Sequence, residues 1–121
     1  MLDLIFYGVQ GEDPQYIQLS ESFYEWLARS EFSKIGGSES VRLNLEGEVV
    51  DLPLVKLELK TRDRLANFFR DQIVVETERI LVQLDELFSK DVYQEVTYRL
   101  RKLQELRKSV ENQNYLYLQR V

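Results

Sequence analysis

The hydrophobic pattern at the start of the chain indicates a strand. Residues 2–8 (LDLIFYG) are aromatic, leucine-rich or branched, and the run ends at a glycine, which is typical of a buried strand. The following segment, residues 9–15, contains Asp13 and Pro14, and this pair indicates a turn or loop. We therefore expect a strand at 2–8 that leads into an irregular connection.

Helical spacing begins at residue 19 in the segment LSESFYEWLARSEF. Ser22 and Glu25 have the spacing of a capping box, in which a hydroxyl and a carboxylate satisfy free N–H groups of the first turn. The pattern predicts a helix at about 21–33, which the pair Gly36-Gly37 terminates.

Apolar and polar residues alternate in two later segments, residues 41–47 (VRLNLEG) and 54–60 (LVKLELK). This alternation is typical of strands with one buried face and one exposed face. A hairpin turn at 46–48 would join them, and Pro53 marks an edge, a bulge or a break because it has no N–H to donate.

The second half of the chain predicts two long helices. Thr61 is the expected N-cap of the first helix, which runs to about Phe88, and Asp91 with Gln94 forms a capping box for the second, which ends before Asn112. The expected buried stripes are Leu65, Phe69, Ile73, Ile80, Leu84 and Leu87 on the first helix, and Val92, Val96, Leu103, Leu106 and Val110 on the second.

The tail, residues 115–121 (YLYLQRV), alternates like a strand and is expected to return beside residues 2–8. The predicted order is therefore β-α-β-β-α-α-β, an α+β domain over residues 1–121 in which a small, mostly antiparallel sheet packs on helices. The short break near Ser89 makes the two long helices an antiparallel hairpin. An alternative has residues 62–112 protrude as a helical hairpin that joins two copies.

Each long helix carries one charged residue on its apolar stripe. Glu76 lies between Ile73 and Ile80 in helical projection, and Arg99 lies within the stripe of the second helix. A buried unpaired carboxylate would cost several kcal/mol, so we expect Glu76 and Arg99 to pair across the hairpin and fix its register. The weaker alternative makes Glu76 an acid with a shifted pKa in a cleft.

The first long helix is also apolar away from its main stripe. Phe68, Val75 and Val82 recur at seven-residue spacing on a different side. They would either be covered by the sheet or another helix, or form an exposed strip that binds a partner or a second copy.

Composition excludes several classes of enzyme. The chain has no Cys and no His, which excludes disulfides, thiolate metal sites and catalytic sites built on a histidine base. The phosphate-loop spacings are missing around Gly36-Gly37, and the acidic residues match no calcium loop. We therefore expect no catalytic residue, no metal and no cofactor.

Charge is distributed unevenly along the chain. The net charge is −5, and residues 1–60 carry eleven Asp and Glu against five Lys and Arg. An acidic half favours encounter with a basic protein. The candidate partner-binding carboxylates are Glu12, Asp13, Glu21, Glu25, Glu46 and Glu48.

A basic stretch, residues 98–108 (YRLRKLQELRK), is the one feature that suggests nucleic-acid binding. The acidic balance of the whole chain argues against that interpretation. The N-terminus does not resemble a signal peptide and no apolar run has the length of a membrane span, so we expect a cytoplasmic protein.

These observations favour a small non-catalytic protein-binding module: an inhibitor, an immunity or antitoxin-like protein, or an adaptor that occupies a partner surface. The alternative is a structural homo-oligomer, such as a homodimer, assembled through the helical hairpin 62–112. A carboxylate-based enzyme is a further alternative.

Overall fold

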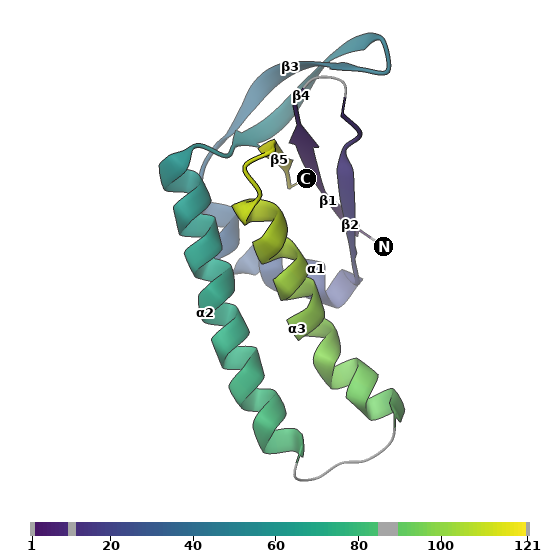
Figure 1. Ribbon diagram of the computed structural model, residues 1–121, viewed down its shortest axis with the longest axis vertical. Coiled ribbons are helices and arrows are strands. Elements are labelled where there is room, and N and C mark those ends of the chain that lie inside the picture. The colour runs from purple at the N-terminus through teal and green to yellow at the C-terminus, as the bar shows by residue number, and fades with distance from the viewer. Residues whose placement is uncertain (1, 10–11, 85–89, 121) are drawn as a thin grey trace.

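The computed structural model describes residues 2–9, 12–84 and 90–120. These ranges hold a five-stranded antiparallel sheet, three α-helices and one short 3-10 helix, which confirms the predicted α+β class. Two long helices run side by side away from the sheet (Figure 1). The elements are β1 (Leu2–Gly8), β2 (Gln15–Leu19), α1 (Glu21–Arg29), η1 (Glu31–Lys34), β3 (Ser38–Leu45), β4 (Glu48–Lys56), α2 (Leu59–Leu84), α3 (Lys90–Glu111) and β5 (Tyr115–Gln119).

The last strand of the chain is the central strand of the sheet. The strand order is β2-β1-β5-β4-β3, and each neighbouring pair is antiparallel. The predicted return of the tail beside residues 2–8 is confirmed, with Tyr7 opposite Tyr117 in the register of β1 and β5. The first half of the chain supplies both outer pairs of strands.

Strand β2 was not predicted. Ile17 and Leu19 are buried toward the core, while Tyr16 and Gln18 are exposed, so the alternation expected of a strand is present. It covers only five residues directly after Pro14, which is too short to stand out beside the loop signal. The observed order therefore has one more strand than the predicted order.

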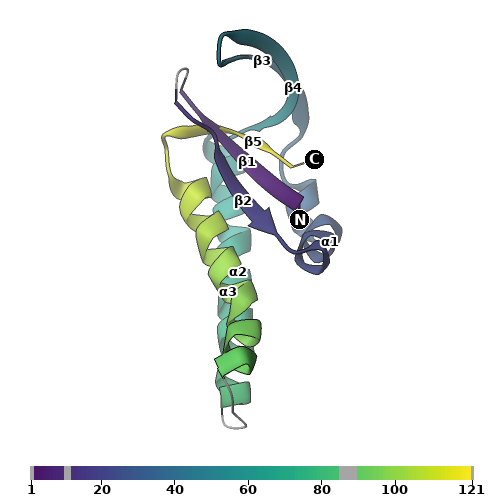
Figure 2. The ribbon, with the colours of Figure 1, turned by 90° about the vertical axis from the view of Figure 1, so that its right-hand side faces the viewer.

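Strands β3 and β4 form a hairpin that curves away from the rest of the sheet like a hook (Figure 2). β4 pairs with β5 only through Val55 and Lys56. Pro53 has its missing N–H on the side away from β3, where this part of β4 has no neighbouring strand. The prediction of a strand through 54–60 is wrong at its end, because the strand stops at Lys56 and α2 begins at Leu59.

The first helix starts at Glu21 as predicted, but its N-cap residue and its end differ from the prediction. The N-cap is Ser20, whose hydroxyl accepts a hydrogen bond from the N–H of Phe23, and Ser22 lies inside the first turn. The α-helix ends at Arg29, because Ser30 adopts an extended conformation and caps the following 3-10 turn. A serine favours such caps over helix interiors because its hydroxyl bonds to the nearby backbone.

Both long helices begin two or three residues earlier than predicted. α2 begins at Leu59, so Thr61 is not its N-cap, and α3 begins at Lys90, which places Asp91 in the first turn. The predicted helix end at Phe88, the stripe residue Leu87 and the break at Ser89 lie outside the described residues. The predicted burial of Val92 is wrong, since its side chain is 40% exposed.

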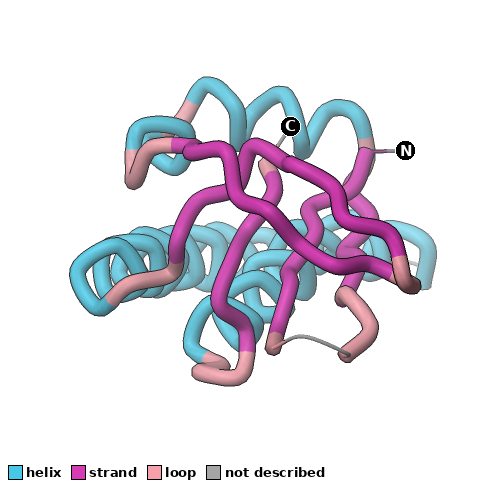
Figure 3. Tube along the Cα trace, turned by 90° about the horizontal axis from the view of Figure 1, so that it is seen from above, coloured by secondary structure: helices cyan, strands magenta, loops and turns pink. Residues whose placement is uncertain are grey.

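The core lies between the sheet and the helices. Figure 3 shows the strands passing in front of the helices when the molecule is seen from above. Strands contribute residues from one face only, and α1, α2 and α3 contribute their apolar stripes. The largest fully buried side chains are Phe6, Phe23, Phe69, Leu4, Leu19, Leu27, Leu54, Leu65, Leu103, Leu106 and Leu118. All but Leu54 belong to one contiguous cluster.

Two arginines hold the ends of the central strand. Arg62 donates hydrogen bonds of 2.7–3.0 Å to four carbonyls, two at the end of α3 (Val110 and Asn112), one just after β4 (Leu57) and one at the start of β5 (Tyr115). Arg120 donates to the carbonyls of residues 32, 35 and 36 at 2.6–2.7 Å. Burial lowers the pKa of both guanidinium groups from the ordinary value. A cation at a helix C-terminus also complements the helix dipole.

Candidate functional site

The tip of the β3–β4 hairpin is a tight two-residue turn. Leu45 pairs with Glu48, and the two residues between them, Glu46 and Gly47, have positive φ values of 51° and 85°. Such values match the type I′ turn, whose twist suits a β-hairpin. The predicted turn is therefore confirmed, and it projects two exposed carboxylates, Glu46 and Glu48, from the end of the hook.

This tip faces the connection between β1 and β2 across a hollow of about 720 Å³. Four of the six acidic residues selected from the sequence line it: Glu12 and Asp13 from the connection, and Glu46 and Glu48 from the hairpin. The remaining lining residues are Pro14, Tyr16, Asn44, Leu45, Gly47 and Val50. Residues more than thirty positions apart in the chain thus share one acidic surface.

A second hollow of about 290 Å³ adjoins the first under the curve of the hairpin. The two hollows share Glu12, Asn44 and Leu45. Its walls come from three parts of the chain and include apolar and aromatic side chains, namely Tyr7, Val9, Leu43, Leu116 and Tyr117, with Gly8 beside them and Arg42 at the rim. We call the two hollows together the hairpin groove, which has an acidic end and an apolar end.

The second face of the sheet forms the floor of the apolar end. Tyr7 and Leu54 are 6% and 0% exposed, yet they alternate with the core residues Phe6 and Val55, so they face away from the helices. The Tyr7 hydroxyl donates to the side-chain oxygen of Gln119 at 2.7 Å. Burial, and secondarily the nearby Tyr16, raise the pKa of the Tyr7 hydroxyl. The Tyr7 hydroxyl in this floor is therefore neutral.

Glu12 bends back over β1. Its N–H donates to the carbonyl of Val9 at 3.2 Å. A Cβ on Gly8 would lie 2.7 Å from Oε2 of Glu12 and 3.0 Å from the carbonyl oxygen of Asn114. A side chain at position 8 would therefore push the Glu12 carboxylate out of its place at the junction of the two hollows and crowd the Asn114 carbonyl.

The negative charge of the groove is not neutralised locally. Among the described residues, the four carboxylates of the acidic end form no ion pair. Arg42 at the rim pairs with Asp51 on β4, with Nε and Oδ1 3.0 Å apart. That hydrogen bond raises the pKa of Arg42 and lowers the pKa of Asp51. The groove can therefore attract cationic side chains and receive apolar groups at its other end.

The remaining acidic candidates lie elsewhere. Glu21 and Glu25 are exposed on α1, and Glu25 lies 3.6 Å from Arg29 one helical turn later. They are not among the residues that line the groove. The sequence indicated all six carboxylates as candidates for partner binding, but only four of them line the hairpin groove.

The strip predicted on α2 is divided between core and surface. Phe68 is half-buried and packs on Trp26 and Phe32, with ring centroids 6.4 and 6.3 Å apart. Val75 and Val82 are 50% and 71% exposed. Val74 and Leu81, which the sequence analysis did not single out, are 57% and 59% exposed and add to an apolar surface on the far half of α2.

The predicted ion pair between the two long helices is present. Nε of Arg99 lies 3.1 Å from Oε1 of Glu76, which is 3% exposed, and Arg79 approaches the same oxygen at 3.5 Å. The Arg99 guanidinium also lies over the Trp26 ring, 4.2 Å from its centroid. Glu76 is thus held by two cations inside a contact of three helices, and it has no part in the hairpin groove.

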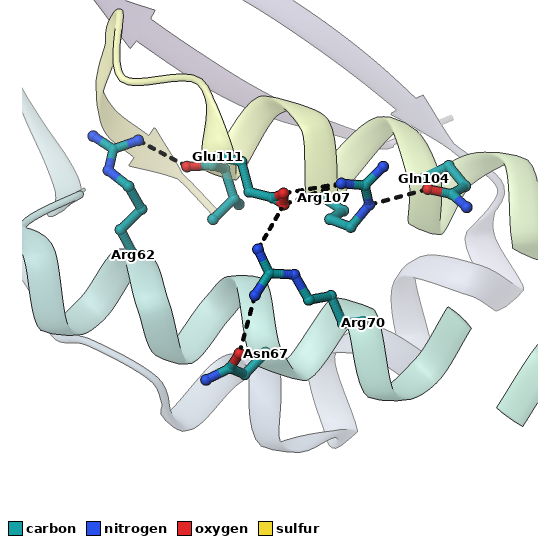
Figure 4. Close-up of polar contacts among 7 residues, drawn as sticks. Arg62, Asn67, Arg70, Gln104, Arg107 and Glu111 are labelled. Carbon is teal, nitrogen blue, oxygen red and sulfur yellow. Dashed lines mark hydrogen bonds and ion pairs between the residues drawn. The ribbon is translucent and has the colours of Figure 1, made fainter. Parts of the chain in front are cut away.

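A second polar contact joins α2 and α3 nearer the sheet (Figure 4). Glu111 accepts hydrogen bonds from Arg70 on α2 at 3.1 Å and from Arg107 on its own helix at 2.9 and 3.0 Å. Arg70 also donates to Asn67, and Arg107 to Gln104. These cations are satisfied within the protein, so this surface is a structural contact between the helices.

The described parts of the chain contain no group of three or more Asp or Glu residues placed to hold a metal ion. No helix within them combines the length and the apolar character needed to cross a membrane. Comparison of the chain with protein-family models, with curated proteins and with solved structures finds no match.

Proposed function

We propose that the protein is a small non-catalytic protein-binding module whose hairpin groove occupies a basic surface on its partner. The observation that carries this proposal is the convergence of Glu12, Asp13, Glu46 and Glu48 on one open hollow. An inhibitor, an immunity or antitoxin-like protein, and an adaptor all act by such occupancy.

The charge of the groove supports a partner rich in Lys or Arg. Like charges held close together raise the energy of the free surface, and a cationic partner relieves that repulsion on binding. The adjoining apolar end, with Leu43 and Leu116 in its walls, can receive an apolar side chain or the methylene stem of a lysine. Such a combination gives both fast encounter and contact area.

The test is capture of the partner by three forms of the tagged chain. The wild type is compared with Glu46→Lys/Glu48→Lys in the groove and with Glu21→Lys/Glu25→Lys on α1, which changes the net charge equally. We expect a stoichiometric basic partner that the groove variant loses and the α1 variant keeps, with slower association at higher salt. Retention of the partner by the groove variant, or equal loss in both variants, would contradict the proposal.

A second candidate function is a structural homo-oligomer assembled through the far half of α2. Val74, Val75, Leu81 and Val82 are each at least 50% exposed there, and clustered apolar side chains on a surface mark interaction sites. The pairing of α2 with α3 leaves this face uncovered, so a second copy could pack against it.

Sedimentation of the purified chain separates this second function from the first. An oligomer would have a multiple of the 14.4 kDa monomer mass and would dissociate with Val75→Glu or Val82→Glu. Asn67→Glu, an exposed position on the same helix, is the control that should leave the mass unchanged. A monomer at all concentrations would exclude the homo-oligomer and leave the binding-module proposal intact.

A further inference from the structure

Strand β2 is one free edge of the sheet, and it borders a groove of about 500 Å³ with α3. Every position from Gln15 to Gln18 lines this groove. The opposite wall is one side of α3 and the residues after it, namely Lys102, Glu105, Lys108, Ser109, Asn112 and Tyr115. A groove between an edge strand and a helix is the geometry in which an extended peptide can join a sheet.

The register of the sheet determines which backbone groups face this groove. Leu57 donates its N–H to the carbonyl of Leu116 at 2.9 Å, so the Leu116 backbone faces β4. Backbone groups of successive strand residues face opposite sides. When this alternation is continued through the β5–β1 and β1–β2 registers, the N–H and C=O groups of Tyr16 and Gln18 point away from β1.

The next backbone group on that side is already satisfied. The N–H of Ser20 donates to the hydroxyl of Tyr98 on α3 at 2.9 Å. This bond agrees with the alternation, and it closes one end of the open row. An added strand would therefore pair with Tyr16 and Gln18 and stop where α3 meets the end of β2.

The charges in this groove differ in sign from those of the hairpin groove. Lys102 pairs with Glu105, with Nζ and Oε2 3.2 Å apart, whereas exposed Lys108 forms no ion pair with any described residue. The wall of α3 therefore has an excess positive charge within an acidic protein. A carboxylate on an incoming strand would complement it.

We propose that an extended segment of another protein, with acidic side chains on one face, adds to β2 as a sixth antiparallel strand. Its backbone pairs with Tyr16 and Gln18, and its carboxylates face Lys108. This docking site is separate from the partner-binding role of the hairpin groove, although Tyr16 borders both hollows. Either proposal can fail without the other.

The test is an NMR titration of the isotope-labelled full chain with two blocked hexapeptides. One alternates threonine with glutamate, and the other alternates threonine with lysine. We expect saturable shifts at the amides of Tyr16 and Gln18, with at least roughly fivefold tighter binding of the glutamate peptide. Lys108→Glu should weaken or reverse that preference, while Glu46→Lys/Glu48→Lys should leave the peptide site in place.

Proline variants test the backbone contact directly. Gln18→Pro removes an N–H that faces away from β1, so the sheet is preserved, and binding of the glutamate peptide should weaken by roughly tenfold or more. Gln18→Thr keeps the N–H and should keep binding. Ser40→Pro places proline on the other edge strand, also facing outward, and should have no effect on the peptide.

Three results would overturn the proposal. The first is the absence of saturable shifts in the wild type. The second is a failure of either selectivity test, namely equal binding of the two peptides or unchanged binding by Gln18→Pro. The third is a change of the Tyr16 and Gln18 amide signals with the concentration of the chain alone, which would show that a second copy occupies the edge.

Discussion

The two faces of the sheet are used differently. On the face toward the helices, Leu4, Phe6 and Leu118 are at most 1% exposed inside one continuous apolar cluster. On the other face, Tyr7 and Leu54 are also buried, but the curved β3–β4 hairpin leaves an open groove with four carboxylates that form no ion pair among the described residues. The first face holds the fold together, whereas the second presents an uncovered charged surface.

This difference separates stability from recognition within one small chain. Substitutions on the helical side should change the free energy of unfolding, because they remove packing or leave buried polar groups unpaired. Substitutions at exposed groove positions should leave that free energy nearly unchanged, since surface positions usually shift it by less than about 0.5 kcal/mol. The predictions below are ordered by the size of the expected effect.

Phe69→Ala should have the largest effect. Phe69 is 0% exposed and contacts Phe32 and Phe68 in the core, so its truncation should lower the free energy of unfolding by about 3–5 kcal/mol. Val82→Ala on the same helix is the control and should cost less than about 0.5 kcal/mol because Val82 is 71% exposed. Urea denaturation of both variants checks the difference, and equal losses would contradict the division between core and surface.

Removing one partner of the buried ion pair should have the next largest effect. Glu76→Gln or Arg99→Met should each cost about 2–3 kcal/mol, below the value for a fully buried pair because the Arg99 side chain is 26% exposed. The double variant should lose less than the sum of the single variants, since neither remaining group is left charged and unpaired. Additive losses in a double-mutant cycle would show that the pair does not fix the register of the helices.

Loss of the Arg62 clamp should have a moderate effect. Arg62→Met leaves four backbone carbonyls without their donor and should cost about 1.5–2 kcal/mol. Arg62→Lys should recover only part of this loss, because one ammonium group does not reach all four carbonyls. Full recovery by lysine would show that charge at the end of α3, rather than the geometry of the guanidinium, is what matters.

The smallest effect should come from the pair at the rim of the groove. The hydrogen bond and charge of Arg42 lower the pKa of Asp51 below its ordinary value. The pair therefore stabilises the fold above the ordinary pKa of an aspartate, and that contribution disappears as pH falls through the lowered pKa. Asp51→Asn should flatten the acid side of the stability profile slightly, and an unchanged profile would show that the exposed pair contributes nothing.

Local patterns in the sequence predict much of the fold. Helical spacing identifies the α2–α3 hairpin, and the charges within its stripes, Glu76 and Arg99, predict a contact that the structure contains. This prediction is correct because it depends only on the spacing of residues along each helix and on the short connection that makes the two helices antiparallel neighbours. Strand β2 was not predicted, because the five residues after Pro14 are too few to establish an alternation of apolar and polar positions.

The groove depends on information that local patterns do not hold. Glu12 and Glu46 line the same hollow because β5 inserts between β1 and β4. The β1–β2 and β3–β4 hairpins therefore flank a central strand that comes from the end of the chain. Strand order is set by long-range packing, and the same alternation is compatible with several orders. For the same reason, the sequence could not separate Glu21 and Glu25 from the carboxylates of the groove.

Hydrogen exchange of the chain in complex with its captured partner tests the central claim most directly. The hairpin groove should show the strongest protection, at residues 12–14 and 43–50, while the far half of α2 should exchange as in the free protein. Protection confined to α2, around residues 74–82, with unchanged exchange in the groove would contradict the account and favour assembly through the helical hairpin.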